Sequence, residues 1–533
     1  MIKRALISVS DKTGIVPFAK TLKKHGCEII STGGTLSKLE ESGIKVHDVS
    51  VFTKNPEVFG GKVKTLSFQI SGALLFDRDK DVEEAKRLDI EAIDLVVCNC
   101  YPFEMFRRQG AGMDKLIENV DIGGPTMIRS AAKNFAHVAI LTDPKDYLSI
   151  MQELDREKGA ISYETRRGLM QKAFNYVADY DAMIAMAMDK LGGTSSLRFA
   201  FTRGKSLRYG ENAHQKALFF KEKDSDDSLY DMNVLNGKKL SYNNLVDISS
   251  AIDSVCDLER FACSVIKHNT PCGMSESGNQ RRSLELAWNG DSISAFGSVV
   301  AFNKEVEEES VEFFHLDDED KRKRKFVEVL IAPKFSSGAL EKLRKHKNLR
   351  LIECSLSGKE EKEFRYFKGS LLVQDVDKKL FEGFSCVTQN EMGGLDQELM
   401  KFGLKAVKQV KSNAIAIVRR YSDEAFQLIG MGAGQPNRLV SVSLALNKCR
   451  ENLANEYEGE EEELESYIKS ELENALLISE AFFPFPDSVE FCANYGIKTI
   501  IQPGGSIRDA SVIEACNKRG ITMILTGLRH FKH

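Results

Sequence analysis

The chain has 533 residues, more than one hydrophobic core normally supports, so we expect two or three domains. Hydrophobic residues make up 42% of the sequence and charged residues 29%, as is typical of a globular protein. The formal net charge of -4 argues against a nucleic-acid-binding protein, because displacing the counterions of a phosphate backbone requires a basic surface.

The cysteines and the N-terminus indicate a cytoplasmic protein. The 11 cysteines include no C-x-x-C pair, so we expect reduced thiols rather than disulfides or a zinc knuckle. The N-terminus enters a strand directly, without the apolar segment of a signal peptide, and no run of about 18 apolar residues follows. We therefore expect no membrane association.

The first 150 residues alternate between strand and helix patterns. Residues 5–9 and 28–31 are short apolar strands, and the segment 14–25 between them has helical spacing. This alternation predicts a parallel sheet with helices on both faces. Ligands bind such sheets at the carboxyl ends of the strands, so the strand-to-helix turns are the candidate sites.

These turns combine glycines, hydroxyl groups and lysines. The turn at 31–35 contains two glycines, which let the backbone approach a ligand, and it leads into a helix whose first N–H groups are unpaired. It therefore predicts a phosphate-binding turn; the alternative is that Thr35 only caps the helix. Similar turns occur at 10–14, 60–65 and 121–126.

The N-terminal segments resemble the IMP cyclohydrolase domain of the bifunctional purine-biosynthesis family, which has a methylglyoxal-synthase-like α/β fold. The resemblance is carried by residues 10–14, 31–35, 61–66, 99–103, 121–124 and 131–134. It implies that FAICAR closes to IMP with loss of water, with Lys64, Tyr101, Asp121 and Lys133 as catalytic residues. The implied substrate-binding residues are Ser10, Lys12, Ser31, Thr32, Gly34, Thr35, Lys62 and Thr65.

Three positions depart from that family. Lys62 stands where the family usually has an arginine, and it keeps the charge but loses bidentate phosphate recognition. Ser67 and Ser71 occupy the region where the family usually has histidines. One alternative is therefore that the N-terminal domain only binds nucleotide or phosphate, as a regulatory domain fused to a transformylase.

A long helical pattern over 163–189 precedes the candidate linker. The segment 192–196 is rich in glycine and serine. We expect a domain boundary here, with residues 1–195 forming the first domain and 196–533 the second.

The segment Lys267-His268-Asn269-Thr270-Pro271-Cys272-Gly273 follows an apolar run that predicts a buried strand. Adjacent side chains on a strand point to opposite faces, so Lys267 and His268 serve one substrate only if the strand breaks here. We expect Thr270-Pro271 to provide that break. The alternative is a core histidine beside a lysine that reaches to the surface.

The second half also resembles the bifunctional family, whose transformylase domain has two cytidine-deaminase-like α/β subdomains. The matching segments are 207–215, 267–273, 294–297, 328–333, 411–413, 430–438, 481–485 and 529–533. The resemblance implies transfer of a formyl group from 10-formyltetrahydrofolate to AICAR, giving FAICAR. It also implies a homodimer, with folate as co-substrate and no tightly bound cofactor.

The amine of AICAR is a weak nucleophile and needs a base, for which His268 is the natural candidate. Lys267 would donate to the oxyanion or to the departing folate nitrogen, and Asn413 would donate to the same charge. The resemblance implies further substrate-binding residues, namely Arg208, Tyr209, Gly297, Glu328, Arg438, Phe483 and Arg529, with Arg208 and Arg438 on the phosphate.

Other functions are less well supported. A zinc deaminase requires H-x-E and P-C-x-x-C, but Thr270 stands at the glutamate position and Ser275 at the second cysteine, so we expect no metal site. The glycines at 430, 432 and 434 fail the spacing of a dinucleotide-binding loop.

Overall fold

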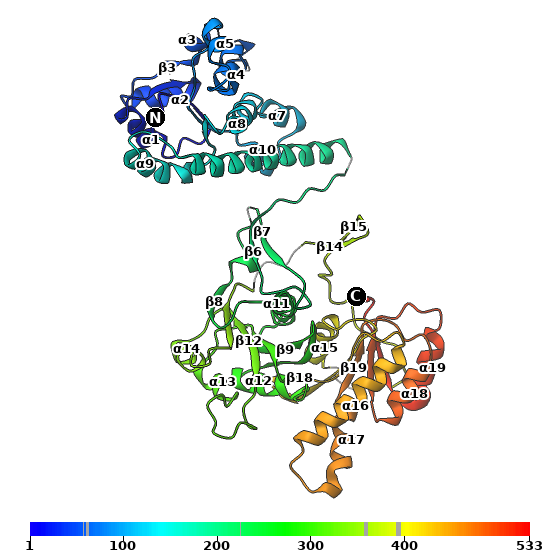
Figure 1. Cartoon of the computed structure of the whole chain (residues 1–533). Helices are drawn as coiled ribbons and strands as arrows, with labels where there is room; N and C mark the ends of the chain where they lie inside the picture. Colours follow the sequence, from blue (N-terminus) through cyan, green and yellow to red (C-terminus); the bar gives the residue numbers. More distant parts are fainter. Residues whose placement is uncertain (57, 60–62, 194, 224, 357–360, 391–395) are drawn as a thin grey trace. The chain divides into compact units, whose positions relative to one another are not determined.

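The computed structural model describes residues 1–56, 58–59, 63–193, 195–223, 225–356, 361–390 and 396–533. The chain divides into two compact units, Met1–Ala200 and Phe201–His533 (Figure 1). The division lies at the end of an exposed segment, 195–199, that follows the last helix of the first unit. No helix in the described part of the chain has both the length and the apolar character needed to cross a bilayer.

The first unit is built on a parallel sheet with strand order β3-β2-β1-β4-β5. Its strands are β1 (Arg4–Val9), β2 (Glu28–Ser31), β3 (His47–Asp48), β4 (Leu95–Asn99) and β5 (Ala139–Leu141). Its helices are α1 (Ile15–Lys24), α2 (Gly33–Glu41), α3 (Val49–Thr53), α4 (Phe68–Leu75), α5 (Val82–Arg87), α6 (Phe103–Arg108), α7 (Met113–Glu118), α8 (Gly123–Lys133), α9 (Tyr147–Arg156) and α10 (Tyr163–Gly192).

Helices cover both faces of this sheet, as the alternating pattern predicts. Leu6 points into the core formed with α4, α8 and α10, whereas Ile7 points into the core formed with α1 and α9. This alternation follows from the two-residue period of a strand. All five strands therefore end at one edge, where the strand-to-helix turns lie.

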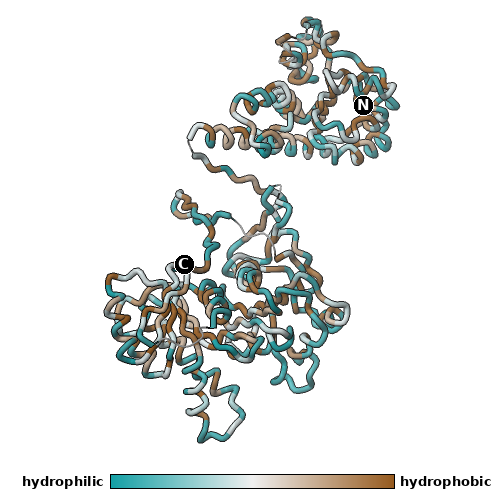
Figure 2. The backbone as a smooth tube through the Cα atoms, turned by 180° about the vertical axis from the view of Figure 1, so that it is seen from behind, coloured by the Kyte–Doolittle hydropathy of each residue, from teal (hydrophilic) through white to brown (hydrophobic). Residues whose placement is uncertain are grey.

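The second unit contains a mixed sheet with order β16-β21-β20-β19-β17-β18-β10-β9-β11-β12-β13-β8. Its strands are β8 (Asn233–Asn236), β9 (Phe261–Lys267), β10 (Thr270–Ser277), β11 (Ser298–Phe302), β12 (Val327–Ala332), β13 (Arg350–Glu353), β16 (Ser385–Cys386), β17 (Ile415–Ser422), β18 (Ala425–Gly432), β19 (Leu476–Ser479), β20 (Thr499–Gln502) and β21 (Thr522–Leu525). Its helices are α11 (Tyr242–Val255), α12 (Gln280–Asn289), α13 (Glu308–Glu312), α14 (Ser337–Leu343), α15 (Gln397–Lys408), α16 (Arg438–Glu456), α17 (Leu464–Asn474), α18 (Asp487–Asn494) and α19 (Asp509–Arg519). Hydrophobic stretches run through this unit in Figure 2.

This sheet consists of two copies of one topology. In each copy a helix leads into an antiparallel hairpin, which is β9–β10 in the first copy and β17–β18 in the second. Two parallel strands then extend each copy outward, β12 and β13 in one and β20 and β21 in the other. The copies join through the antiparallel pair β10–β18. The two α/β subdomains expected from the sequence correspond to these copies.

Glycines bring the central strands close to their helices. A Cβ on Gly273 of β10 would lie 1.8 Å from the carbonyl oxygen of Ala287 in α12. A Cβ on Gly432 of β18 would lie 2.0 Å from that of Ser441 in α16. Gly430 and Gly432 therefore serve helix-to-sheet packing in the second copy, as Gly273 does in the first, whereas Gly434 lies in open space with a φ of 66°.

Two hairpins lie outside the large sheet. They are β6 (Phe201–Ser206) with β7 (Leu218–Glu222), and β14 (Lys362–Phe367) with β15 (Ser370–Asp375).

Candidate active site

The first turn of the N-terminal unit is fixed by Asn99 at the end of β4. The Oδ1 atom of Asn99 accepts the N–H groups of Ser10 (2.7 Å) and Asp11 (2.8 Å), and its Nδ2 donates to the carbonyl of Asp11. Asn99 was not among the predicted site residues, although it directly precedes the turn that contains Tyr101. It joins the first and fourth strand ends into one surface.

The hydroxyl groups of the second turn hold the sheet together. Ser31 donates to the carbonyl of Ile7 (2.8 Å), and Thr35 bonds the backbone of Val9. Thr32 lies at the start of α2 and shares a hydrogen bond with the hydroxyl of Ser8. The alternative in which Thr35 only caps the helix is therefore wrong, because its hydroxyl binds β1.

Two lysines lie at the N-terminus of α2. A Cβ on Gly33 would be 3.3 Å from Nζ of Lys64, and a Cβ on Gly34 would be 3.8 Å from Nζ of Lys12. The bare glycine backbone leaves room for both ammonium groups beside the first N–H groups of the helix. This arrangement suits a phosphate or a developing oxyanion.

Asp121 connects this cluster to α8. Its carboxylate accepts the N–H of Gly124 (2.8 Å) and of Tyr101 (3.3 Å). Burial raises the pKa of Asp121, while these N–H groups and the charge of Lys64 oppose the rise. Lys64, Tyr101 and Asp121 are thus brought together, and the hydroxyl of Thr65 lies 2.7 Å from the Cβ position of Gly123 beside them.

Two further predicted residues of the N-terminal unit are Lys133 and Lys62. Lys133 is exposed in the last turn of α8, ten residues from Gly123, which is about 15 Å along the helix axis. Lys62 lies outside the described residues. Ser67 accepts the N–H of Ile70 and caps α4, so this departure from the family pattern has a structural role.

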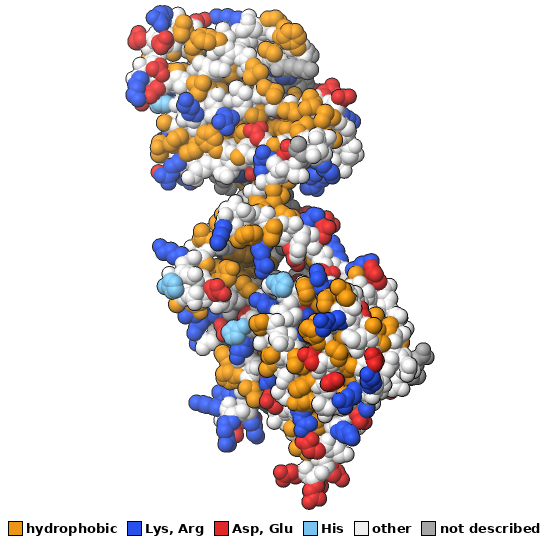
Figure 3. Space-filling view, turned by 90° about the vertical axis from the view of Figure 1, so that its right-hand side faces the viewer, with side chains coloured by type: hydrophobic (Ala, Val, Ile, Leu, Met, Phe, Trp, Pro, Cys, Tyr) orange, Lys and Arg blue, Asp and Glu red, His pale blue; other side chains and the backbone are white. Residues whose placement is uncertain are grey.

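In the C-terminal unit, strand register places the predicted residues at one edge of the large sheet. Lys267 pairs with Thr270 at the end of β9, and Ile415 pairs with both Gly432 and Ser479 across three neighbouring strands. The ends of these and the neighbouring strands, with the segments that follow or precede them, carry the predicted residues Lys267, His268, Gly297, Glu328, Asn413, Arg438, Phe483 and Arg529. Figure 3 shows histidine, lysine and arginine side chains around a hollow on this unit.

The break after β9 differs from the prediction. His268 and Asn269 both have positive φ (52° and 62°) and form a two-residue hairpin turn, whereas Pro271 lies inside β10 at an irregularity in the register. The expectation that Thr270-Pro271 breaks the strand was therefore wrong. The turn exposes His268, which also excludes a core histidine.

Asp247 of α11, which the sequence analysis missed, holds this turn. Its Oδ1 accepts the N–H of Asn269 at 2.7 Å. Burial raises the pKa of Asp247, and the hydrogen bond from Asn269 and, to a smaller extent, the neighbouring His268 counteract that rise. Lys267 is fixed separately, because its Nζ donates to the carbonyl of Phe296 at 2.8 Å. The side chain of Lys267 is thus held at the end of β9, and the backbone of the turn that carries His268 is held by α11.

Asn413 is held by Arg438. Nη2 of Arg438 donates to Oδ1 of Asn413 (2.7 Å), and the amide nitrogen of Asn413 donates to the carbonyl of Gln435 (2.8 Å). Both terminal nitrogens of Arg438 also bond the fully buried carboxylate of Glu480, at 2.5 and 3.0 Å. Arg438 is therefore committed to Glu480 and Asn413, which leaves the predicted phosphate contact without support.

The other predicted binding residues differ in exposure. Phe483 is 0% exposed and packs in the core, so it does not line a site. Glu328 pairs with Arg350 at 3.0 Å. Arg208 and Arg529 are exposed, with their guanidinium groups over the rings of Tyr209 and Phe531. Gly297 adopts a φ of 77° and donates its N–H to Phe326.

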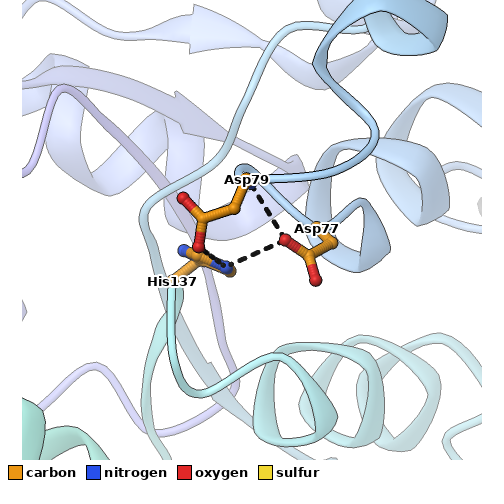
Figure 4. A group of neighbouring side chains, drawn as sticks. All are labelled: Asp77, Asp79 and His137. Atoms are coloured by element: carbon orange, nitrogen blue, oxygen red, sulfur yellow. Dashed lines mark hydrogen bonds and ion pairs between the residues drawn. The ribbon is translucent and has the colours of Figure 1, made fainter.

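Two places in the described part of the chain carry side chains of metal-binding types. Burial raises the pKa of Cys272 to about 12, which disfavours the thiolate that a deaminase zinc site needs. Asp77, Asp79 and His137 form a cluster in the N-terminal unit (Figure 4), with Nε2 of His137 at 3.6 and 3.9 Å from the two carboxylates. Asp77 also pairs with Lys80, so the cluster is a partly exposed ion-pair network apart from the site residues.

Two family models match the chain. The model described as AICARFT/IMPCHase bienzyme matches residues 131–448, and the model described as MGS-like domain matches residues 14–126. The predicted α/β fold class, with its N-terminal parallel sheet, is confirmed by these matches.

Curated relatives match along the whole length. Proteins named bifunctional purine biosynthesis protein PurH are 42% identical over 546 residues in Persephonella marina, 41% over 536 in Clostridium botulinum and 40% over 535 in Fusobacterium nucleatum. In each case 100% of both chains is covered. The alternative of a purely regulatory N-terminal domain is not favoured. The chain belongs to the AICARFT/IMPCHase bienzyme family and is a bifunctional enzyme of purine biosynthesis, an AICAR transformylase and IMP cyclohydrolase.

Proposed function

We propose that the N-terminal unit closes the ring of FAICAR and that the C-terminal unit transfers the formyl group to AICAR. This assignment is supported by the two separate sheets, because each sheet carries polar predicted site residues along one edge. The observation that carries it is the exposed His268, placed on a two-residue turn beside Lys267 at the edge that also holds Asn413.

In ring closure, the carboxamide nitrogen of FAICAR attacks its own formyl carbon. Both groups belong to one molecule, so orientation supplies much of the rate. Asp121 takes the proton from that nitrogen, and Lys64 stabilises the oxyanion. The proton held by Asp121 then passes to this oxygen, which leaves as water with the former formamide N–H proton as the ring C=N bond forms. Tyr101 lies beside Asp121 through its N–H contact. The N-terminus of α2 and Lys12 bind the phosphate.

In formyl transfer, the amine of AICAR attacks the formyl carbon of 10-formyltetrahydrofolate, and the bond from that carbon to the folate nitrogen breaks. His268 takes the amine proton, and Lys267 donates to the oxyanion or to the departing nitrogen. Asn413 helps to shape this edge, because its amide nitrogen donates to the carbonyls of Gln435 and Pro436 and its oxygen accepts from Arg438. Arg208 and Arg529 bind the phosphate, which their exposed guanidinium groups support.

We also propose a cytoplasmic homodimer that uses folate as co-substrate. The exposed hairpin β14–β15 supports a dimer, because a two-stranded ribbon is marginally stable alone. Its apolar side chains include Tyr366 and Leu372, which are 73% and 58% exposed. A mass of two chains by light scattering, reduced to one chain by Tyr366→Lys with Leu372→Lys, would support this assembly.

The central test is His268→Ala, assayed separately for each half-reaction. Formyl transfer should fall by at least about a hundredfold, because the base is lost. Ring closure from supplied FAICAR should persist. His315→Ala, at another exposed histidine, serves as the matched control. Unchanged formyl transfer in His268→Ala would refute the assignment.

A further inference from the structure

Two phenol side chains of α10 pack against the core of the N-terminal unit. Tyr176 and Tyr180 are four residues apart and so lie on the same face of this helix, the long helix of the first unit in Figure 1. That face also carries the buried residues Ala173 and Val177, and it packs in the core shared with β4, α4 and α8. Both hydroxyl groups thereby reach the backbone of segments that carry predicted site residues.

Tyr176 holds the backbone beside Tyr101. Its phenol oxygen accepts the N–H of Cys100 at 2.9 Å. Cys100 lies between Asn99, which fixes the first turn, and Tyr101. Because Cys100 is only 6% exposed, its N–H needs a partner within the protein. The phenol supplies that partner at the point where the chain leaves β4.

Tyr180 holds the backbone of Asp121 in the same way. Its oxygen accepts the N–H of Asp121 at 3.0 Å, and its hydroxyl donates to the carbonyl of Asn119 at 3.5 Å. Tyr180 is buried, and its ring packs edge-on against that of Phe103, with the centroids 6.5 Å apart. The phenol is therefore oriented by packing as well as by hydrogen bonds.

These contacts form one continuous series. The carboxylate of Asp121 accepts the N–H of Tyr101, the neighbour of Cys100, at 3.3 Å. Each end of this pair is tied to α10, one through Tyr176 and the other through Tyr180. The proposed phosphate-binding group at the N-terminus of α2 is fixed in a different way, by hydroxyl bonds to β1.

We infer that Tyr176 and Tyr180 are positioning residues for ring closure. The inference rests on the proposed roles of Asp121 and Tyr101 in that reaction. The two phenols bond the backbone of the segments that carry these groups, and so set where the groups lie relative to FAICAR. A reaction whose rate comes largely from orientation is sensitive to small displacements of such groups. Loss of a phenol should therefore slow the chemical step and leave phosphate binding intact.

The test replaces each tyrosine by phenylalanine in the full chain, which keeps the ring and removes only the hydroxyl. In Tyr180→Phe, kcat of ring closure from supplied FAICAR should fall about tenfold or more, with the KM for FAICAR within about twofold of the native value. Tyr176→Phe should lower kcat by about threefold to tenfold, because it acts on Asp121 only through neighbouring residues. Formyl transfer by the same preparations should be unchanged.

Tyr163→Phe is the matched control, because this tyrosine lies on the same helix with 50% of its surface exposed. It should alter neither kcat nor KM. Calorimetry of each variant measures whether the N-terminal unit is folded at the assay temperature.

The outcomes separate this inference from the proposed function. Unchanged kcat in both phenol variants, or a rise in KM without a fall in kcat, overturns the inference. So does a loss of kcat that disappears at a lower temperature at which calorimetry shows the unit fully folded, because the phenols would then act on stability alone. Asp121→Asn, assayed alongside, tests the proposed function: ring closure that survives this substitution refutes the proposed site.

Discussion

The carboxylate of Asp247 holds the turn that presents His268, without itself belonging to the sequence motif. Its hydrogen bond to the N–H of Asn269 fixes a turn in which two consecutive residues have positive φ. Such a conformation is unfavourable for residues other than glycine unless neighbouring groups stabilise it. Asp247 is thus a positioning residue for the proposed base.

Asp247→Ala should lower kcat of formyl transfer at least about tenfold, because the turn that presents the imidazole loses its hydrogen bond to α11. Asp247→Asn keeps the acceptor oxygen and should recover part of the loss. Steady-state kinetics of both half-reactions would measure this, with ring closure unaffected. An equal loss of kcat in Asp247→Ala and Asp247→Asn would show that the charge of Asp247, rather than its hydrogen bond to Asn269, supports formyl transfer.

Asp121 carries a prediction about pH. Burial raises its pKa, so the acid limb of ring closure should lie above the ordinary aspartate value of about 4. The folded state holds this proton more tightly than the unfolded state, so stability falls as pH rises from the ordinary pKa through the raised one.

Asp121→Asn should therefore abolish ring closure while raising Tm at neutral pH by about 1–3 °C. Calorimetry and a pH–rate profile would test both effects. Asp114→Asn, at an exposed carboxylate on α7, should change neither property. A lower Tm in Asp121→Asn would contradict the assigned burial effect.

The residue types at the strand ends could be predicted from the sequence, whereas their partners could not. Glycine, hydroxyl and lysine residues in strand-to-helix turns follow local rules, and these turns meet at one edge. Glu480 lies 42 positions after Arg438, and no local pattern indicates that the two groups pair. For the same reason the burial of Phe483, which depends on packing from other elements, was missed.

Among the helices and strands, the close packing of α16 against β18 positions part of the C-terminal site. Arg438 begins α16, and this helix is held against β18 because Gly432 has no side chain. Any Cβ there meets the backbone of Ser441. Gly430 of the same strand likewise lies against α16, where a Cβ would be 2.4 Å from the carbonyl oxygen of Ala445, so two glycines set the short distance between the two elements.

Gly432→Ala should destabilise the C-terminal unit by at least about 1–3 kcal/mol, because the helix must move to admit the methyl group. Formyl transfer should fall as well, since the helix carries Arg438 and thereby Asn413. Denaturant unfolding would measure the change. Gly168→Ala, in an open position on α10, should be neutral or slightly stabilising. Equal stability of Gly432→Ala and the native protein would contradict the packing argument.

The helix and strand periods predicted the alternation of the N-terminal unit and the length of α10, since these depend on neighbouring residues. The hairpin turn at 268–269 was missed, because two non-glycine residues with positive φ have a weak local signal. The duplicated topology was expected only from family resemblance. Periodicity alone does not reveal which strands pair across 150 residues.

For the whole molecule, the exposed segment 195–199 joins two units that each have their own core. Proteolysis should cut the chain there first, because the segment has no regular structure to protect it. The N-terminal fragment should keep ring closure. Mass spectrometry of the fragments and an assay with FAICAR would establish both points; loss of ring closure after a clean cut would show that the units depend on each other.

A cut between the two copies of the C-terminal topology, unlike a cut at 195–199, should leave no active fragment. His268 belongs to the first copy and Asn413 to the second, and the seam β10–β18 lies at the centre of the sheet. Each half produced alone would expose that central strand to solvent and carry an incomplete set of transfer groups. Neither half should therefore be active without the other. In cells that lack this enzyme, a gene split at this point should restore growth only when both products are made together.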